Sequence, residues 1–325
     1  MHKIALLTDR RYVDDSVDSG MPEAYVANVM QEDRYVMEAC QRAGMDIERI
    51  AWCNPDAQWD TYTAAIFRTT WDYFDRWPAF SLWLNQVSTQ TTLLNSEQIV
   101  SWNLDKHYLN DLEIAGVSVV PTAFVPKNTA IPLFEVASRR AWSEVVIKPA
   151  VAGAARDTYR IDLSGSVHVL SPEPANFKDS EHLWHSLLSK QDMLVQPFLT
   201  DVIDTGELSL IWIDGEITHA VRKKAKAGDF RVQDDHGGSV HAAVVDPEMS
   251  LLGKAIMTKC LQLCQARGWD APLYARIDLM KDRNEQWLLS ELELVEPELW
   301  FRHQPRAAFL LAEAVKNRLE RTFSS

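Results

Sequence analysis

The stretch Tyr274-Ala-Arg-Ile-Asp278, followed thirteen residues after Asp278 by Glu291-Leu-Glu293, decides how the rest of this chain is interpreted. The two segments read as neighbouring strands joined by a polar hairpin loop. Because alternate residues of a strand share a face, Glu291 and Glu293 point the same way, and Asp278 joins them if its strand is the neighbour. Three carboxylates that converge in this way need cations. The pattern predicts a magnesium site, and an acidic, solvated hairpin face is the alternative.

Composition restricts the class of protein that surrounds this hairpin. A length of 325 residues suggests two or three domains, and 46% hydrophobic residues are enough for sizeable cores. No stretch approaches the roughly 20 apolar residues of a membrane span. The formal charge of −13 disfavours nucleic acid and anionic membranes as partners. The four cysteines fit neither a disulfide framework nor a metal motif, so we expect a reduced, cytoplasmic protein.

The N-terminal third has the pattern of a small, mostly parallel α/β domain. Residues 3–7, 45–51 and 62–68 read as buried strands, and residues 33–43 and 77–88 read as helices. Ligands of open α/β sheets lie beyond the carboxyl ends of the strands, although ordinary turns remain the alternative. On that basis the candidate substrate residues, which follow the first and third strands, are Asp9, Arg10, Thr70 and Asp72.

Two lysines precede or border a stretch of small residues. Lys106 lies within a predicted helix at 99–115, and Lys148 lies in the apolar strand Val145-Val-Ile-Lys-Pro149. A buried ammonium group needs a partner. The segment that follows, residues 150–156, is small enough for its backbone N–H groups to cover phosphates, although a lone lysine on an edge strand remains the alternative.

A second group of cations lies between residues 219 and 231. In an acidic protein such a cluster indicates an anion site rather than a solvated hairpin, and Arg222 and Arg231 offer the fork geometry that suits phosphate or carboxylate.

Taken in order, these motifs resemble the ATP-grasp superfamily, most closely the branch of glutathione synthetase and the ribosomal-protein glutamate ligases. Thr-Trp71-Asp-Tyr and the segment from Asn95 to Lys106 are similar to the subgroup of the cycloserine-forming cyclo-ligase. The resemblance spans roughly residues 95–300. Its motifs are Lys106, Val-Ile-Lys148-Pro, Val-Gln196-Pro-Phe, Gly206-Glu207, Val221-Arg-Lys, Ala227-Gly-Asp-Phe-Arg231, Gly237-Gly238, Arg-Ile-Asp278 and Glu291-Leu-Glu293.

The resemblance implies a role for each matched residue. ATP would be bound by Lys106, Lys148, Gly153, Gln196, Pro197, Phe198, Leu199 and Glu207. Catalytic cations would be Arg222, Arg231 and Arg276. Mg²⁺, as two ions for which Mn²⁺ can substitute, would be held by Asp278, Glu291 and Glu293. The chain departs from the family where Glu293 replaces a common Asn and where Pro297-Glu298-Leu-Trp300 replaces small residues. Glu298 is therefore a further substrate candidate.

The implied fold is an α/β (α+β) ATP-grasp fold. It would consist of an N-terminal parallel α/β domain at 1–115, a central subdomain at 116–200 and a C-terminal subdomain with the metal site at 201–325. The implied reaction is activation of a small amino-acid-like carboxylate as an acyl phosphate, which an amine-type nucleophile attacks in an amide-forming or cyclising step that releases ADP and phosphate. A small-molecule kinase and a non-catalytic nucleotide-binding regulator are the alternatives, and a homodimer is the assembly left open.

Overall fold

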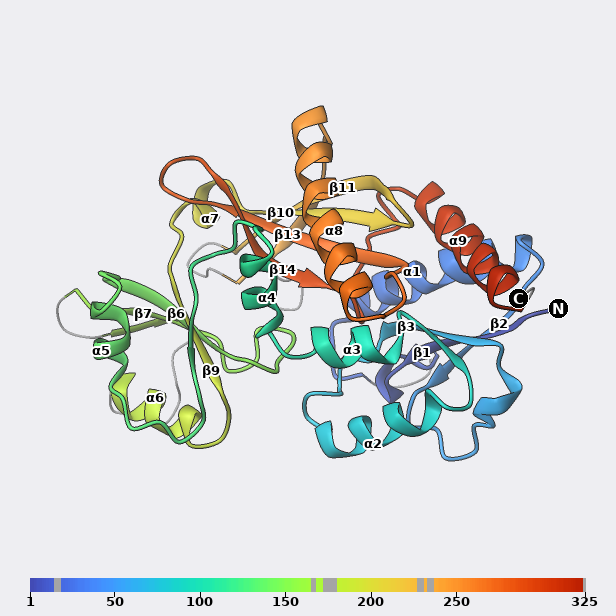
Figure 1. Ribbon diagram of the computed structural model, residues 1–325, viewed down its shortest axis with the longest axis horizontal. Coiled ribbons are helices and arrows are strands. Elements are labelled where there is room, and N and C mark those ends of the chain that lie inside the picture. Colours follow the sequence, from blue (N-terminus) through green and yellow to red (C-terminus); the bar gives the residue numbers. More distant parts are fainter. Residues whose placement is uncertain (15–18, 165–167, 172–179, 227–230, 233–236, 324–325) are drawn as a thin grey trace.

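Three separate sheets organise the chain in the computed structural model, which describes residues 1–14, 19–164, 168–171, 180–226, 231–232 and 237–323. In Figure 1 one sheet with its helices occupies the lower right, one the left, and one the upper centre between them. The mixture of parallel and antiparallel strands is the predicted α/β (α+β) class.

The N-terminal sheet is parallel throughout and has the strand order β2-β1-β3-β4. Its central strands are buried on both faces, as a parallel sheet covered by helices requires. The predicted strands and the second helix are confirmed. The elements are β1 (Lys3–Thr8), β2 (Asp46–Ala51), β3 (Ala64–Thr69), β4 (Thr92–Leu94), α1 (Glu23–Arg42) and α2 (Trp77–Val87), with short turns η1 (Arg10–Tyr12) and η2 (Trp59–Thr61).

Helix α1 begins ten residues earlier than the predicted helix at 33–43. Its buried residues concentrate from Val29 onwards, so the first turns carry no apolar stripe from which a helix could be recognised. The buried carboxylates Glu32 and Asp33 lie where the stripe should start. Asp33 is paired with Arg68 at 3.1 Å and with Arg49 at 2.9 Å, and these two ion pairs offset the cost of burying its charge.

The second sheet is antiparallel, has the order β5-β9-β6-β7-β8, and bears two helices. Its apolar side chains form a core of their own around Val145, Ile147 and Trp184. The elements are β5 (Ala123–Val125), α5 (Leu133–Ser138), β6 (Glu144–Pro149), β7 (Tyr159–Asp162), β8 (His168–Ser171), α6 (Ser180–Leu188) and β9 (Met193–Pro197).

The third sheet is also antiparallel, with the order β12-β11-β10-β13-β14. The predicted two-residue turn at Asp214-Gly215 is confirmed, and both residues have positive φ, 41° and 104°. The predicted hairpin around Asp278 is β13 with β14. The elements are α7 (Asp201–Asp204), β10 (Glu207–Ile213), β11 (Glu216–Lys224), β12 (Ser239–Ala243), α8 (Pro247–Ala266), β13 (Tyr274–Lys281), β14 (Trp287–Glu293) and α9 (Arg306–Phe323).

The predicted helix at 99–115 is two helices, α3 (Glu97–Asn103) and α4 (Tyr108–Ile114), with Lys106 between them. The break has a local cause. The Asn103 amide donates to the Leu292 carbonyl and accepts from the Leu294 N–H, both at 2.7 Å, and the Lys106 N–H donates to the Ala150 carbonyl at 2.9 Å. Bonds of this kind replace the intrahelical ladder and bring the lysine against the third sheet.

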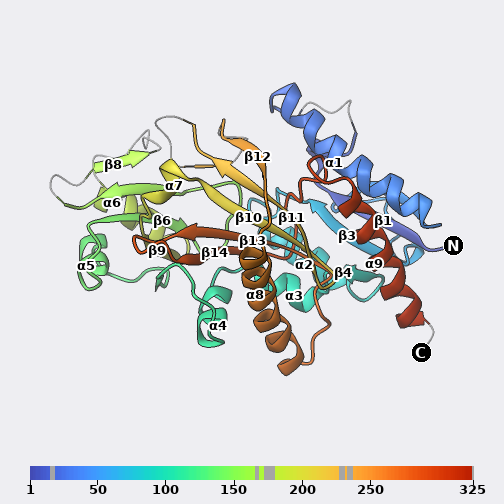
Figure 2. The same cartoon turned by 90° about the horizontal axis from the view of Figure 1, so that it is seen from above.

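Helices α1 and α9 lie against each other, and α9 covers one face of the third sheet together with residues 299–301 (Figure 2). Helix α8 covers the other face. The Glu32 carboxylate of α1 accepts from the Phe301 N–H at 2.6 Å and the Arg302 N–H at 3.0 Å, which fixes the segment after β14. None of the described helices is long and apolar enough to span a bilayer.

Candidate active site

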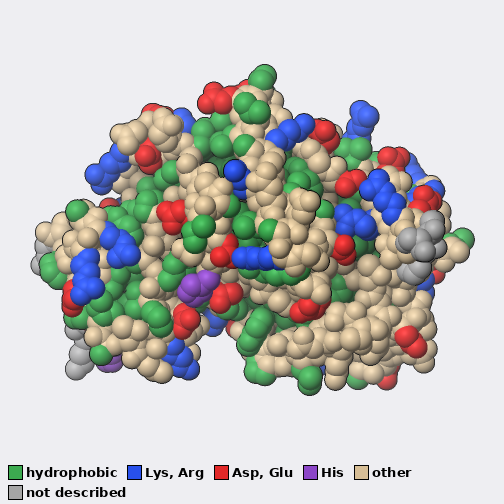
Figure 3. All heavy atoms as spheres, in the orientation of Figure 1, with side chains coloured by type: hydrophobic (Ala, Val, Ile, Leu, Met, Phe, Trp, Pro, Cys, Tyr) green, Lys and Arg blue, Asp and Glu red, His purple; other side chains and the backbone are tan. Residues whose placement is uncertain are grey.

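One cavity of about 470 Å³ is lined by residues of the second and third sheets and of the segments that follow β1 and β3. In Figure 3 the surface is indented between the lobe of α5 and α6 and the lobe of α2, and acidic, basic and histidine side chains lie near the indentation. Thirteen of the predicted site residues line the cavity. They are Lys106, Lys148, Gly153, Gln196, Pro197, Phe198, Leu199, Glu207, Arg231, Arg276 and Glu298, together with the predicted metal ligands Glu291 and Glu293.

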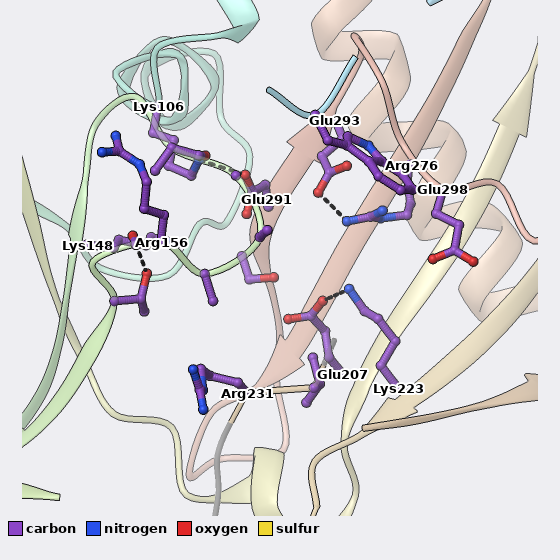
Figure 4. A pocket seen from close by; sticks show the side chains of 18 of the residues that line it. Lys106, Lys148, Arg156, Glu207, Lys223, Arg231, Arg276, Glu291, Glu293 and Glu298 are labelled. Atoms are coloured by element: carbon purple, nitrogen blue, oxygen red, sulfur yellow. Dashed lines mark hydrogen bonds and ion pairs between the residues drawn. The ribbon is translucent and has the colours of Figure 1, made fainter. Parts of the chain in front are cut away.

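The two predicted phosphate lysines lie together near the start of the small-residue loop (Figure 4). The Lys106 Nζ donates to the Ala152 carbonyl at 2.6 Å and pairs with Glu291 at 3.0 Å. Burial lowers the pKa of Lys148, Glu291 opposes that effect, and the charge of Lys106 adds to it. Within the described part of the chain no hydrogen bond or ion pair holds the Lys148 ammonium group. Two ammonium groups with only one carboxylate paired to them suit an anionic ligand.

The small-residue loop passes close to the N-terminal region. A Cβ atom at Gly153 would lie 2.8 Å from the Phe74 ring, so this position is glycine because the backbone approaches the ring closely. Ala154 and Ala155 have positive φ, 49° and 51°. Alanine tolerates this region poorly, and such strain concentrates at ligand sites.

An apolar slot lies beside the strand β9. Phe198, Val202 and Val232 are buried together, and Val146 and Met280 pack against them. All five line the cavity. Apolar side chains grouped along one wall of a cavity are suited to a flat heterocycle. Gln196 lies at its edge, where its amide donates to Thr122 at 2.8 Å.

The strands β10, β11 and β13 contribute a buried network of alternating charge. Lys223 contacts Glu207 and pairs with Asp278 at 3.1 Å. Asp278 also accepts from the Ser209 hydroxyl at 2.6 Å and from Arg276 at 2.8 Å. Burial alone would raise the pKa of Asp278, but the charges of Arg276 and Lys223 outweigh it and hold that pKa below its usual value.

Asp278, Glu291 and Glu293 share one face, because Asp278 lies opposite Glu291 and Arg276 lies opposite Glu293 in the β13–β14 register. In this structure the three carboxylates are not gathered around one point as metal ligands would be. Arg276 contacts both Asp278 and Glu293, and no cluster of three acidic, His or Cys ligands occurs among the described residues. The three carboxylates nevertheless fit a divalent cation, because they repel one another and a cation would relieve that repulsion. Burial raises the pKa of Glu293 to about 8, Arg276 opposes this, and repulsion from Glu291 and Asp278 adds to it.

Arg222 does not face the cavity, and Lys223 takes its place. The Arg222 guanidinium donates to the Thr205 carbonyl at 3.2 Å and lies over the Trp287 ring. Since neighbouring residues of a strand point to opposite faces, only one of the two can reach the cavity, and the face shared with Glu207 and Asp278 belongs to Lys223. The family motif Val221-Arg-Lys contains both residues and does not distinguish them. Lys223 lies opposite Glu207 in the β10–β11 register, and this pairing is the signal that would have selected Lys223.

Four of the five predicted substrate residues do not line the cavity. The Asp9 carboxylate is buried and bound by Arg11, and Thr70 is fully buried. Arg10 borders a separate hollow beside Glu48 and Asn54. The Asp72 carboxylate is held by the Trp52 indole at 2.6 Å and by Arg76 at 2.8 Å. The loops after β1 and β3 do reach the cavity, but these four residues within them do not line it, because turn geometry rather than strand alternation aims their side chains.

The residues that do form the N-terminal wall are largely aromatic. Trp71 packs against Tyr12 and Tyr25 with ring centroids 5.6 and 6.5 Å apart, and its indole donates to the Glu296 carbonyl at 3.0 Å. Arg11 and Glu296 lie in the same wall. Burial raises the pKa of Glu296 to about 7. Sequence reasoning singled out Trp71 as a motif residue but missed Arg11 and both tyrosines.

The segment after β14 supplies the remaining wall. Glu298 lines the cavity and pairs with Arg302 at 2.6 Å, while Arg302 is also bound to Glu32. Trp300 is buried with φ at 47°, in the left-handed region that a tryptophan seldom adopts. Its ring lies 5.1 Å from the Arg276 guanidinium. Residues 227–230 of the predicted basic segment lie outside the described part of the chain.

Known proteins resemble this chain in both sequence and fold. A family model described as the N-terminal domain of D-cycloserine synthetase matches residues 4–95. The cycloserine biosynthesis protein DcsG of Streptomyces lavendulae is 29% identical over 98% of this chain and 99% of its own length. The crystal structure of D-cycloserine synthetase superposes with a TM-score of 0.77 at 26% identity, covering 98% of this chain and 99% of that one. The ATP-grasp ligase PsnB, solved with a minimal precursor, Mg and ADP, gives 0.55 at 14% identity over 98% of both chains and shares the fold.

Proposed function

We propose that this chain, an ATP-grasp ligase related to D-cycloserine synthetase, couples ATP cleavage to closure or formation of an amide-type bond on a small amino-acid-like carboxylate. The observation that carries the proposal is that one cavity is lined by two kinds of residue. We call the apolar slot with Lys106 and Lys148 the nucleotide end, and the aromatic wall with Arg11 and Glu298 the substrate end. The carboxylates of β13 and β14 lie between them.

The nucleotide end is suited to ATP. Phe198 and Val202 would hold adenine in the apolar slot, and Glu207 would accept hydrogen bonds from the ribose hydroxyls. Lys106 and Lys148 would neutralise phosphate oxygens, because Glu291 pairs with Lys106 and leaves the charge of Lys148 without an ion-pair partner among the described residues.

The central residues are suited to phosphoryl transfer. Asp278, Glu291 and Glu293 would hold Mg²⁺, which supplies charge neutralisation at the phosphates. Arg231 and Arg276 would stabilise the negative charge that develops as the substrate carboxylate becomes an acyl phosphate. Glu298, held by Arg302, would accept a hydrogen bond from the substrate ammonium group.

The test is a screen for ADP release over amino acids, dipeptides and O-substituted serines, with products identified by mass spectrometry. A ring-closed product has first priority because the full-length relative is named for cycloserine biosynthesis. A dehydrated product with one ADP and one phosphate per turnover is expected. A phosphorylated product without phosphate release would indicate a kinase instead, and nucleotide binding without turnover on the whole panel would indicate a regulator.

A further inference from the structure

The loop after β1 holds one arginine in a fixed orientation at the substrate end of the cavity. The Asp9 carboxylate is fully buried and accepts from the Arg11 backbone N–H at 2.7 Å, the Arg11 Nε at 3.2 Å and the Arg11 Nη2 at 2.7 Å. One edge of the guanidinium is therefore bound to Asp9. The Arg11 side chain remains 42% exposed and lines the cavity.

We propose that Arg11, oriented by Asp9, binds the carboxylate of the amino-acid-like substrate. The inference rests on the proposed function and names the residue that recognises the substrate. A guanidinium presents donors on more than one edge, so that the edge bound to Asp9 leaves the Nη1 side to meet a second carboxylate. Among the described residues the Arg11 Nη1 makes no hydrogen bond. The Arg11 guanidinium also keeps its positive charge, because arginine is not deprotonated in proteins.

The surroundings of Arg11 match a small amino acid more closely than a phosphate. Tyr12 lies beneath the guanidinium at 5.5 Å, and Trp71 packs edge-on against Tyr12. This wall can cover a short side chain and exclude water from the ion pair. The Arg11–Asp9 pair is neutral overall, so its attraction depends on hydrogen-bond geometry and does not favour the most highly charged anion. Glu298 supplies an acceptor for the ammonium group in the same cavity.

Arg10 provides a matched control in the neighbouring position. It is exposed and borders the separate hollow with Glu48 and Asn54, because the 3-10 turn η1 directs successive side chains apart. Both residues are arginines of one turn, and only Arg11 faces the cavity.

The experiment measures binding of carboxylate and carboxamide forms of the same amino acids to the full chain by calorimetry, alongside KM values from ADP release. Arg11→Lys and Arg11→Ala are expected to weaken carboxylate binding and raise the substrate KM by roughly 10- to 100-fold, with the KM for ATP within about twofold of the original. The preference for carboxylate over carboxamide should disappear in Arg11→Ala and weaken in Arg11→Lys, because lysine keeps the charge but loses the fork geometry. Arg10→Ala should retain both values.

Asp9 acts as a positioning residue, so its variants separate orientation from folding. Asp9→Asn should raise the substrate KM less than Arg11→Ala does and leave the KM for ATP unchanged. The double variant Asp9→Asn, Arg11→Ala leaves no buried charge unpaired and should lose the carboxylate preference with a thermal midpoint close to the original. An undiminished preference in Arg11→Ala, or in the double variant, would overturn the inference.

The outcome for the proposed function is separate. Absence of turnover on the whole panel would reject the ligase reaction, while carboxylate binding that depends on Arg11 would still stand. If the unaltered chain binds no carboxylate form at all, both proposals fail.

Discussion

The nucleotide end and the substrate end of the cavity are built from different kinds of backbone. At the nucleotide end the charged side chains Lys148, Glu207 and Lys223 sit on strands, whose register fixes which residue faces which. At the substrate end Arg11 and Trp71 sit on turns after strands, where one residue more or less redirects the side chain. Functional side chains on strands are therefore more readily predicted from sequence than functional side chains on loops.

The largest expected effect comes from the nucleotide end. Glu291→Gln keeps the shape of the side chain but removes the charge that pairs with Lys106 and that would face Mg²⁺. We expect ADP release to fall by about 10²-fold or more with the fold intact. The control is Glu285→Gln in the exposed loop of the same hairpin, which should turn over normally. Undiminished ADP production in Glu291→Gln would reject the metal and phosphate assignment.

Arg231→Lys tests whether the fork geometry is needed between the two ends. Lysine retains the charge but cannot hold two oxygens at once. The expected result is a kcat lowered by roughly 10-fold or more, with the KM for ATP little changed, because the contact matters most as the acyl phosphate forms. Arg283→Lys in the exposed hairpin loop is the control. If kcat survives and the KM for ATP rises, Arg231 binds ground-state nucleotide instead.

The comparison also explains what could be predicted from sequence. The hairpin register, the parallel sheet and the lysine in β6 followed from alternation and apolar runs. The family motif identified the Arg222–Lys223 pair, but only the partner strand shows that Lys223 faces the cavity. Strand ends pointed to the loop after β1, which borders the cavity, yet the turn η1 decides whether Arg10 or Arg11 lines it. Turn geometry depends on Asp9, whose burial no local pattern reveals.

The early half of α1 and the break before α4 escaped prediction for a related reason. Both are held by distant partners, the segment after β14 for Glu32 and the β14 backbone for Asn103. A sequence window of one helix contains neither partner. Long-range hydrogen bonds of this kind override local propensity.

His219 tests how firmly the substrate end is attached to the strands. Its ring bonds the Leu299 carbonyl and the Thr218 hydroxyl, both at 2.9 Å, which joins β11 to the segment that carries Glu298. Burial lowers the pKa of His219 to about 4, and the charge of His303 adds to this. The unfolded chain takes up the proton near its ordinary value of about 6.5. The contribution of His219 to the free energy of unfolding is therefore fully present above a pH of about 6.5 and is lost as the pH falls towards about 4.

The expected loss from this one group is about 3 kcal/mol at most. Urea unfolding of the original chain and of His219→Gln at several pH values between 7.5 and 4.5 measures it, because contributions of other groups cancel in the difference. The stability advantage of the original chain should shrink as the pH falls. An advantage that stays constant across the range would show that His219 does not titrate between the two states.

The smallest expected effect belongs to Asp72, which the position after β3 made a candidate for binding the substrate. Its carboxylate is held by the Trp52 indole and by Arg76, whose side chain is 36% exposed. Asp72→Asn keeps an oxygen for the indole and loses only a partly exposed ion pair, worth about 1 kcal/mol or less. We therefore expect substrate and ATP KM values within about twofold of the original, with a small drop in thermal midpoint. A selective rise in the substrate KM that matches that of Arg11→Ala would return Asp72 to the substrate site, and the contrast between strand-borne and loop-borne chemistry would then be weaker than the geometry suggests.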